Sequence, residues 1–377
     1  MRRIVEALEW LFRHLVSYPF LRLLFHNEYS DRPLDIRAVK RILILRFDRI
    51  GDMIVTTPIF RILKKHNPAL HIGVFTSQGN AEIISQNKNV DAVYVLHRNW
   101  WKMWKEIRKA RRMEYDVVLN FIFNRTTSAG VLANLVAPRG FKVGQGDDKY
   151  QFFFNRLLKL QRAESHMVEV LVGYIEAVFK FSVHEDDTQL EIVIPHEIRS
   201  QVDKFLKRHQ LVRRDTRPDG SSHYLVMNIS AADRDREMEE RQAVGLIRHL
   251  LSTTPYQIVL IGAPSAEMQL NGIVQQVQSE RCLSFVGEKT APLLQVASLI
   301  EGAQAVITPD TSIIHFASAM KTPVLGFFVT IDKRYEWAPY NVQYDVLLSP
   351  NGKPISEFPL SEMCTAADNF LRSLKNP

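Results

Sequence analysis

The chain has 377 residues, of which 46% are hydrophobic and 24% are charged, so it is long enough for two globular domains with separate cores. Its two cysteines, Cys282 and Cys364, lie in unrelated contexts without a CxxC motif or a Cys/His cluster, which argues against a disulfide framework and a structural zinc site and fits a reducing cytoplasm. The formal net charge of +7 favours an anionic partner without distinguishing nucleic acid, lipid headgroups and phosphorylated sugars.

An N-terminal extension, residues 1–40, precedes the first predicted strand. Its first 25 residues carry apolar side chains at helical spacing until Pro19 interrupts the pattern, which predicts an amphipathic helix. No run approaches the roughly 20 apolar residues that span a bilayer, and no signal-peptide cleavage site follows. The helix is therefore expected either to lie on a membrane surface or to dock on the body of the protein.

Strands and helices alternate in the first half of the chain. The helical pattern of residues 52–66 ends at Asn67-Pro68, and a mostly helical connection is expected over residues 150–181. Such alternation predicts a parallel, doubly wound sheet, and we place an N-terminal Rossmann-like domain at residues 41–190. The predicted strands are residues 41–46, 70–75, 92–96, 117–121 and 141–143.

One helix of this half, residues 98–112, is strongly basic. It has seven basic residues against one acid, Glu106, with Trp100, Trp101 and Trp104 interleaved. Tryptophans settle at the headgroup level of a membrane while Lys and Arg meet phosphates, so the segment fits an anionic lipid surface. The alternative is a solvated helix face whose tryptophans pack inward.

The second half repeats the architecture after a polar stretch at residues 213–222. We place a C-terminal Rossmann-like domain at residues 191–350, followed by a helical segment, 351–377, that we expect to pack back on the N-terminal domain. Two such domains form a cleft between them. Neither GxGxxG nor GxxxxGK[ST] occurs, which argues against dehydrogenases and P-loop kinases. The predicted strands are residues 224–228, 257–261, 305–308 and 323–328, with helices from 266 and 311.

The segment Arg46-Phe-Asp-Arg49-Ile-Gly51-Asp52 follows the first strand, where open α/β sheets place their ligand crevices. Gly51 allows a close backbone approach to a ligand. Asp52, near the start of the next helix, either caps free amides or projects into the cleft as a general base.

The segment Thr308-Pro-Asp310-Thr311-Ser312-Ile-Ile-His315 again follows a strand and opens a helix. A helix start presents unbonded amides to an anion, and its small residues would let a diphosphate approach closely. The alternatives are an ordinary N-cap and a histidine buried in the core.

A third segment, Asn228-Ile-Ser230-Ala-Ala-Asp-Arg-Asp-Arg236, offers hydroxyl and guanidinium groups after the first strand of the second half. Together the three segments resemble glycosyltransferase family 9, the ADP-heptose:lipopolysaccharide heptosyltransferases. Residues 166–169 and the loop Ile261-Gly-Ala-Pro-Ser-Ala-Glu267 add to the resemblance, which covers about residues 40–375. Three positions depart from that family's pattern: Ser312 replaces Gly, Arg236 replaces Lys, and Glu237-Met238 replaces an aromatic-containing stretch.

The resemblance implies a GT-B fold, in which two Rossmann-like domains face each other across a cleft. It also implies transfer of a heptose with inversion from a nucleoside-diphosphate donor, usually ADP-linked, to the lipopolysaccharide core, with no metal or other cofactor. By position, Asp52 is the catalytic base. Arg46, Arg49 and Gly51 line the acceptor side of the cleft. The implied donor-binding residues are Ser230, Arg236, Glu267, Asp310, Thr311, Ser312 and His315.

The expected partners are the nucleotide-sugar donor, a phosphorylated lipid-linked saccharide acceptor and the anionic inner face of the cytoplasmic membrane, with no nucleic acid. A cytoplasmic, peripherally attached enzyme follows from these partners. Two other readings stay open at this point. One is a nucleotide-sugar 2-epimerase of the same architecture, and the other is a non-enzymatic protein that binds nucleic acid or an anionic surface.

Overall fold

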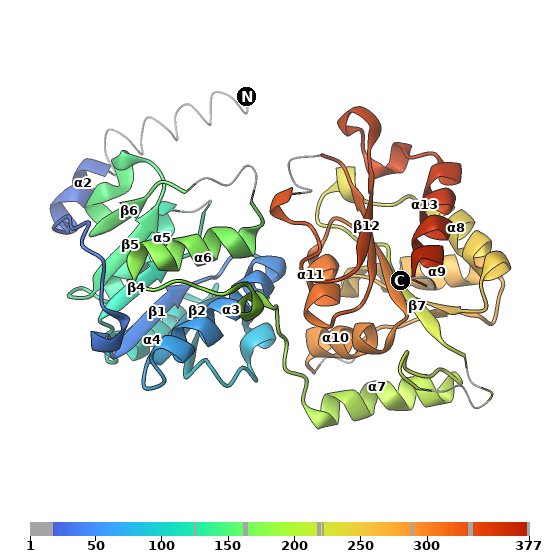
Figure 1. Cartoon of the computed structure of the whole chain (residues 1–377), viewed down its shortest axis with the longest axis horizontal. Helices are drawn as coiled ribbons and strands as arrows, with labels where there is room; N and C mark the ends of the chain where they lie inside the picture. Colours follow the sequence, from blue (N-terminus) through green and yellow to red (C-terminus); the bar gives the residue numbers. More distant parts are fainter. Residues whose placement is uncertain are drawn as a thin grey trace.

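Two parallel β-sheets of six strands each form the two halves of the protein, which lie side by side with helices around each sheet (Figure 1). The structure, a computed structural model, describes residues 18–123, 126–160, 165–216, 220, 222–287, 290–330 and 335–374. The strand orders are β3-β2-β1-β4-β5-β6 and β12-β11-β10-β7-β8-β9, and every pairing is parallel. Both are the doubly wound order of a Rossmann sheet, which confirms the predicted α/β fold.

The N-terminal domain contains the first sheet. Its central strands are buried on both faces, as parallel sheets covered by helices require. Its elements are α2 (Tyr18–Leu24), η2 (Ile36–Ala38), β1 (Arg41–Leu45), α3 (Ile50–His66), β2 (His71–Ser77), η3 (Ala81–Ile84), β3 (Ala92–Leu96), α4 (Trp100–Arg111), β4 (Val117–Asn120), α5 (Thr126–Val136), β5 (Phe141–Gln145), η4 (Asp148–Phe153), β6 (Arg156–Leu158) and α6 (Met167–Val178).

The C-terminal domain contains the second sheet. Helix α7 precedes that sheet and packs on α10. Its elements are α7 (His196–Arg208), β7 (Tyr224–Asn228), η6 (Arg234–Arg236), α8 (Glu240–Thr253), β8 (Gln257–Ile261), η7 (Pro264–Ala266), α9 (Glu267–Val277), β9 (Cys282–Ser284), α10 (Pro292–Gly302), β10 (Ala305–Pro309), α11 (Ser312–Ala319), β11 (Val324–Phe328), β12 (Tyr344–Leu348) and α13 (Leu360–Ser373).

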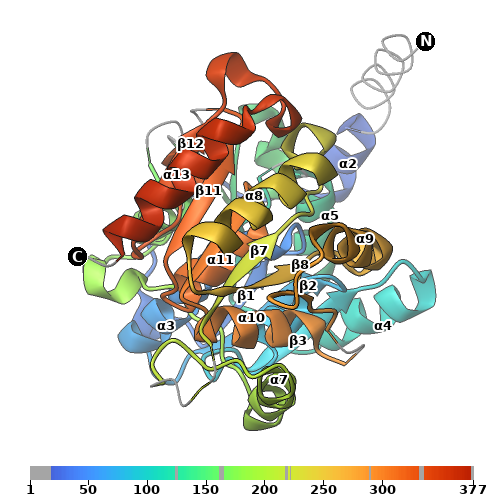
Figure 2. The ribbon, with the colours of Figure 1, turned by 90° about the vertical axis from the view of Figure 1, so that its right-hand side faces the viewer.

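Two expectations for these elements are wrong. The connection over residues 150–181 is helical only in part, because besides η4 and α6 it contains the edge strand β6, which pairs with β5. Helix α13 packs on α8 and β12 of the C-terminal domain (Figure 2), and Figure 1 shows that it stays in that half of the molecule. Its apolar side chains, among them Met363 and Phe370, complete the core on one face of the second sheet, which would otherwise face water.

Helix α3 places its first turn at the carboxyl end of β1, although it carries Pro58 in its interior. Proline has no N–H to donate to the carbonyl oxygen of Ile54, and the Thr57 hydroxyl donates to that oxygen instead, at 2.7 Å. The Thr56 hydroxyl donates in the same way to the carbonyl oxygen of Asp52, at 2.7 Å. The helix therefore runs continuously from Ile50 to His66.

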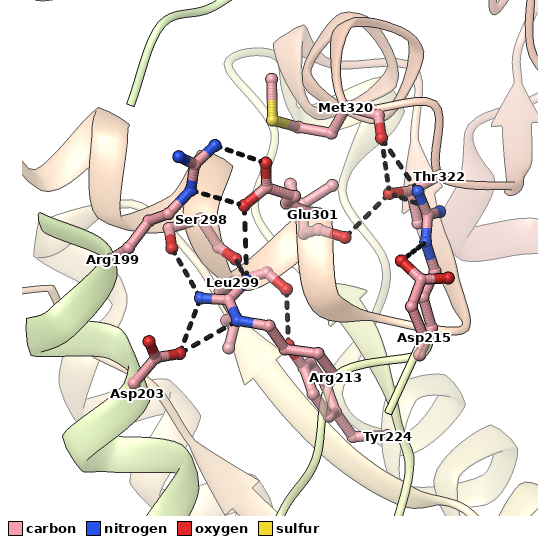
Figure 3. A network of polar contacts seen from close by, with 12 residues as sticks. Arg199, Asp203, Arg213, Asp215, Tyr224, Ser298, Leu299, Glu301, Met320 and Thr322 are labelled. Atoms are coloured by element: carbon pink, nitrogen blue, oxygen red, sulfur yellow. Dashed lines mark hydrogen bonds and ion pairs between the residues drawn. The ribbon is translucent and has the colours of Figure 1, made fainter. Parts of the chain in front are cut away.

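Two neighbouring arginines between α7 and β7, Arg213 and Arg214, bind the two helices that begin at the cleft, and Figure 3 shows Arg213 with its partners. Arg213 donates to the carbonyl oxygen of Ser298 near the end of α10, at 2.9 Å. Arg214 donates to the carbonyl oxygens of Met320 and Lys321 just beyond α11, at 3.2 and 2.9 Å. Arg214 thus satisfies carbonyls just beyond the C-terminus of α11, and both guanidinium groups complement the helix dipoles in the half of each helix away from the cleft.

The exterior of the N-terminal domain carries exposed apolar side chains on two helices. Residues 1–17, which include most of the predicted amphipathic helix, lie outside the described residues. On α2, Phe20, Leu23 and Leu24 are exposed, and on α4, Trp100 and Trp101 are 54% and 75% exposed. In the part of the chain that the structure describes, no helix combines the length and apolar character needed to cross a membrane.

Candidate active site

A cavity of about 610 Å³ lies between the two domains. It is formed at the carboxyl ends of β1, β7, β8 and β10, where doubly wound sheets bind ligands. Nine of the eleven predicted site residues line it: Arg49, Gly51, Asp52, Ser230, Arg236, Asp310, Thr311, Ser312 and His315. The three sequence segments therefore meet in one place, as expected for segments that each directly follow a strand of a parallel sheet.

Arg46 does not line the cavity, which corrects its predicted place on the acceptor side. Its side chain is fully buried and turns beneath the β1–α3 loop, where Nη1 lies 3.1 Å from Oδ2 of Asp48 and Nη2 lies 3.2 Å from Oδ1 of Asp52. Nε donates to the carbonyl oxygen of Asp52 at 2.9 Å, and Nη1 also donates to that of Phe121. A buried guanidinium thus joins two carboxylates of the cavity wall.

Asp52 lies in the first turn of α3, but its side chain does not cap that helix. The N-cap is Arg49, which makes no side-chain capping bond, and the Asp52 side chain is 13% exposed at the cavity wall. Of the two roles that spacing alone allows, the geometry favours the carboxylate that projects into the cleft.

Asp48 is a cavity residue that the sequence analysis did not select. Burial raises the pKa of its carboxyl group to about 6; the Arg46 guanidinium opposes this shift, and the neighbouring Asp52 carboxylate adds to it. The sequence does show a second acid four residues before Asp52 in the same glycine-containing loop. The significance of this acid becomes clear only from the structure, where Arg46 lies between the two carboxylates.

The facing wall is built around the start of α11. Thr311 caps this helix, with its hydroxyl accepting from the amide of Ile313 at 3.3 Å. Asn228, at the end of β7, donates to the Thr311 hydroxyl at 3.2 Å and to the carbonyl oxygen of Ser230 at 3.0 Å. Asn228 therefore joins the loops after β7 and β10, and the predicted helix start does face the cavity.

Arg236 supplies a cation beside this helix start. Its Nη1 donates to the carbonyl oxygen of Asp310 at 2.9 Å and lies 3.2 Å from Oδ2 of the same residue, and Nη2 pairs with Asp233. The Ser230 hydroxyl accepts from the amide of Ala263 at 2.7 Å and so joins the β7 and β8 loops. These contacts hold a guanidinium, a hydroxyl and a helix start on one wall.

Glu267 lies outside this wall, since it is exposed at the start of α9 and does not line the cavity. The loop before it contributes Ala263 and Pro264 instead. The cavity also has an apolar lining that the sequence did not reveal, because its side chains come from four separate segments. Its residues are Ile261, Leu270, Phe285, Val286, Pro292, Leu293 and Val296.

His315 and Gly51 form a close contact between the domains. A Cβ atom at position 51 would lie 2.8 Å from Cδ2 of His315, so only glycine allows α3 and α11 to approach this closely. Burial, and then the nearby His166, lower the pKa of His315 to about 3, so its ring is neutral. Among the described residues, its Nδ1 atom has no hydrogen-bond partner.

Two further contacts across the domains flank the cavity. His166, the N-cap of α6, accepts from the amide of Val168 through Nδ1 at 3.2 Å, which leaves the proton on Nε2 to donate to the carbonyl oxygen of Ala338 at 3.0 Å. Burial lowers the pKa of this imidazole to about 4. On η3, the Glu82 carboxylate accepts from the amide of Leu294 in the first turn of α10, at 2.8 Å.

Comparison with known proteins connects this geometry to a family. The family described as glycosyltransferase family 9 (heptosyltransferase) matches residues 100–361. Lipopolysaccharide heptosyltransferase 3 of Escherichia coli is 24% identical over 306 residues, which cover 77% of this chain and 84% of that protein.

Solved structures are similar over nearly the whole chain. The glycosyltransferase family 9 protein of Veillonella parvula superposes with a TM-score of 0.73 at 20% identity, covering 91% of this chain and 100% of its own. The E. coli heptosyltransferase WaaC with ADP has a TM-score of 0.67 at 20% identity, covering 88% of this chain and 99% of its own. These similarities confirm the predicted GT-B arrangement of two Rossmann-like domains.

Proposed function

This chain belongs to glycosyltransferase family 9, the heptosyltransferase family, and from that premise we propose that it transfers a heptose from ADP-heptose, with inversion, to the lipopolysaccharide core. The observation that carries the proposal is the cavity itself. It sets an acidic wall, with Asp52, opposite a wall that offers a helix start, a hydroxyl and a guanidinium. Family membership favours transfer over the epimerase and non-enzymatic readings.

We assign the donor to the C-terminal domain, residues 191–350, and the acceptor to the N-terminal domain, residues 41–190. The start of α11 and Arg236 suit a diphosphate, because helix amides and a guanidinium both bind phosphate oxygens. The apolar lining of the cavity suits the flat faces of a nucleobase. The similar E. coli heptosyltransferase WaaC was solved with ADP, which supports ADP as the nucleotide of the donor.

In the proposed reaction, the acceptor hydroxyl oxygen attacks the anomeric carbon from the face opposite the diphosphate, which gives inversion. The bond from that carbon to the diphosphate oxygen breaks, and its electron pair leaves with the nucleoside diphosphate. Asp52 takes the hydroxyl proton as the new glycosidic bond forms. Arg236 and the amides at the start of α11 stabilise the charge that develops on the leaving group, which lets the reaction proceed without a metal.

A panel of nucleoside diphosphates tests the donor site. ADP is expected to raise the melting temperature more than GDP, UDP or CDP, because a ligand that binds only the folded state stabilises it. An Arg236→Gln variant should lose most of this shift. If no nucleotide changes the melting temperature, the donor assignment is wrong.

The base is tested by Asp52→Asn, which keeps the shape of the side chain. Transfer should fall by at least about 100-fold, the lower range for losing a positioned acid-base group, while ADP affinity stays close to that of the wild type. Free epimerised sugar from donor alone would instead support the epimerase reading. Near-wild-type turnover would refute the role of Asp52.

We also propose that the enzyme works at the anionic cytoplasmic face of the membrane, where a phosphorylated lipid-linked acceptor would lie. Helix α4 has its lysines and arginines exposed next to Trp100 and Trp101, which corresponds to the membrane-surface alternative for this segment. Helix α5 separates α4 from α2, and Figure 2 shows the three helices on one side of the molecule. We include the exposed apolar side chains of α2, Phe20, Leu23 and Leu24, in the proposed membrane-facing surface.

Vesicle binding tests this surface. Replacing Lys102, Lys105, Arg108 and Lys109 together by Gln should weaken binding to anionic vesicles by orders of magnitude, because each contributes about 1 kcal/mol near such a surface. Binding of the wild type should also weaken as salt is added. The matched control replaces Lys204, Lys207 and Arg208, exposed on α7, and should bind normally. Equal vesicle binding by both variants would contradict the proposal.

A further inference from the structure

The β1–α3 loop presents two carboxylates to the cavity, and one guanidinium serves both. Asp48 and Asp52 both line the cavity, and Arg46 lies buried between them with one terminal nitrogen directed to each acid. Two negative charges thus share one positive charge. Only one acid is needed to accept the proton of the attacking hydroxyl, so the second requires its own explanation.

We propose that Asp48 is a positioning residue: its carboxylate takes Nη1 of Arg46, so the buried guanidinium is held between two acids and does not neutralise Asp52 alone. The proposal rests on the assignment of Asp52 as the base. If Asp48 carried no charge, the full positive charge of Arg46 would act on the one carboxylate that has to accept the proton. With Asp48 bound to Nη1, the guanidinium still holds Asp52 through the hydrogen bond from Nε to its backbone carbonyl oxygen. Its Nη2 atom makes no hydrogen bond among the described residues and lies 3.2 Å from Oδ1 of Asp52 as an ion pair.

The arrangement fixes geometry as well as charge. Arg46 is fully enclosed and also donates to the carbonyl oxygen of Phe121, so it cannot swing toward either acid. Asp48 has one oxygen on Arg46, and its Oδ1 atom is buried and has no hydrogen-bond partner among the described residues. A carboxylate that is only half satisfied is costly for folding, which points to a use in the working enzyme.

The charged groups around Asp48 set the pH at which this effect operates. Arg46 lies beneath it, Asp52 lies on α3, and Arg49 lies in its own loop. Across the cavity, the C-terminal domain presents Arg236, Asp310 and His315. Because burial raises the pKa of Asp48 to about 6, its carboxyl group carries the needed charge at pH 8 and loses it at pH 5.

The test compares Asp48→Asn with the wild type across pH, using kcat for transfer with saturating donor. At pH 8 the variant should be roughly three- to tenfold slower, following the dependence of general-base rates on basicity. By pH 5 the two rates should converge, because the wild-type carboxyl group is then also neutral. Asp48→Glu should recover most of the rate at pH 8. ADP affinity, measured in parallel, should not change, and Asp48→Ser provides a second neutral side chain if the amide disturbs the loop.

Three outcomes would overturn the proposal. A loss that is equal at pH 8 and pH 5 would mean that Asp48 only supports the loop. A rate equal to that of the wild type at pH 8 would mean that the second charge has no effect. A loss as large as that of Asp52→Asn, not recovered by Glu, would mean that Asp48 itself takes the proton. The assignment of Asp52 as the base is tested separately: an Asp52→Asn enzyme that keeps the wild-type rate of transfer would show that this assignment is wrong.

Discussion

Replacing Gly51 by alanine should show how strongly catalysis depends on the contact between α3 and α11. The added Cβ would lie 2.8 Å from Cδ2 of His315, about 1 Å inside a normal carbon–carbon contact. The His315 ring has little room to retreat, because it is buried and lies against Trp337 and His166. The strain should instead separate the two helices, at a cost of about 1–3 kcal/mol.

The separation would move Asp52, the next residue, away from the donor wall. A displacement of about 1 Å at a reacting group costs roughly 100-fold in rate, so kcat/KM should fall by about that factor while the melting temperature falls by a few degrees. Gly79→Ala is the matched control, because Gly79 lines the same cavity and a Cβ there would lie 3.9 Å from the nearest atom, Oγ of Ser77. Gly51→Ala with wild-type rate and stability would refute the reasoning.

Three further predictions concern stability, each measured by chemical or thermal unfolding. Burial lowers the pKa of His166 from 6.5 to about 4, so the neutral ring makes its full contribution to the free energy of unfolding above pH 6.5 and loses it as the pH falls toward 4. His166→Asn should therefore reduce the slope of the unfolding free energy against pH, which cannot exceed about 1.4 kcal/mol per pH unit for one group. Burial raises the pKa of Asp48 from 3.8 to about 6, so its ionisation destabilises the fold increasingly as the pH rises from 3.8 and fully above pH 6. Asp48→Asn should therefore raise the free energy of unfolding by about 1–3 kcal/mol at pH 8 and leave it unchanged below pH 4. An unchanged free energy of unfolding at pH 8 would contradict this. Gly173→Ala, in α6 with open space around the new Cβ, should raise the free energy of unfolding by about 0.5–1 kcal/mol; a lower free energy of unfolding would contradict this expectation.

The sequence predicted the central strands well because they are continuous apolar runs between turn signals. The edge strands β6 and β9 were missed, since each has only three residues and carries no period of its own. The strand β12 was missed for a different reason: most of its side chains are partly or fully exposed, so no buried face marks it.

At the site, the sequence predicted which loops line the cavity, but it did not predict which groups the individual side chains contact. Arg46 and Asp52 were found together, yet the burial of Arg46 depends on Phe121, which is 75 residues away. Glu267 was selected by its place in a loop, and the helix that follows turns its side chain to solvent. The hydrogen bond between His166 and Ala338 joins the two domains, and the local pattern of apolar residues cannot predict a pair so far apart in sequence.

The pair Arg213 and Arg214 has a genetic consequence. Ser298 lies six residues after the start of α10 and Met320 eight residues after the start of α11, so at 1.5 Å per residue the anchored carbonyls lie roughly 9–12 Å behind the starts of these helices. Changes at these arginines would shift whole helices that begin at the donor wall without altering any residue that faces the ligand. Suppressor screens that start from a weakened donor site should therefore recover substitutions in this segment, well away from the cavity itself.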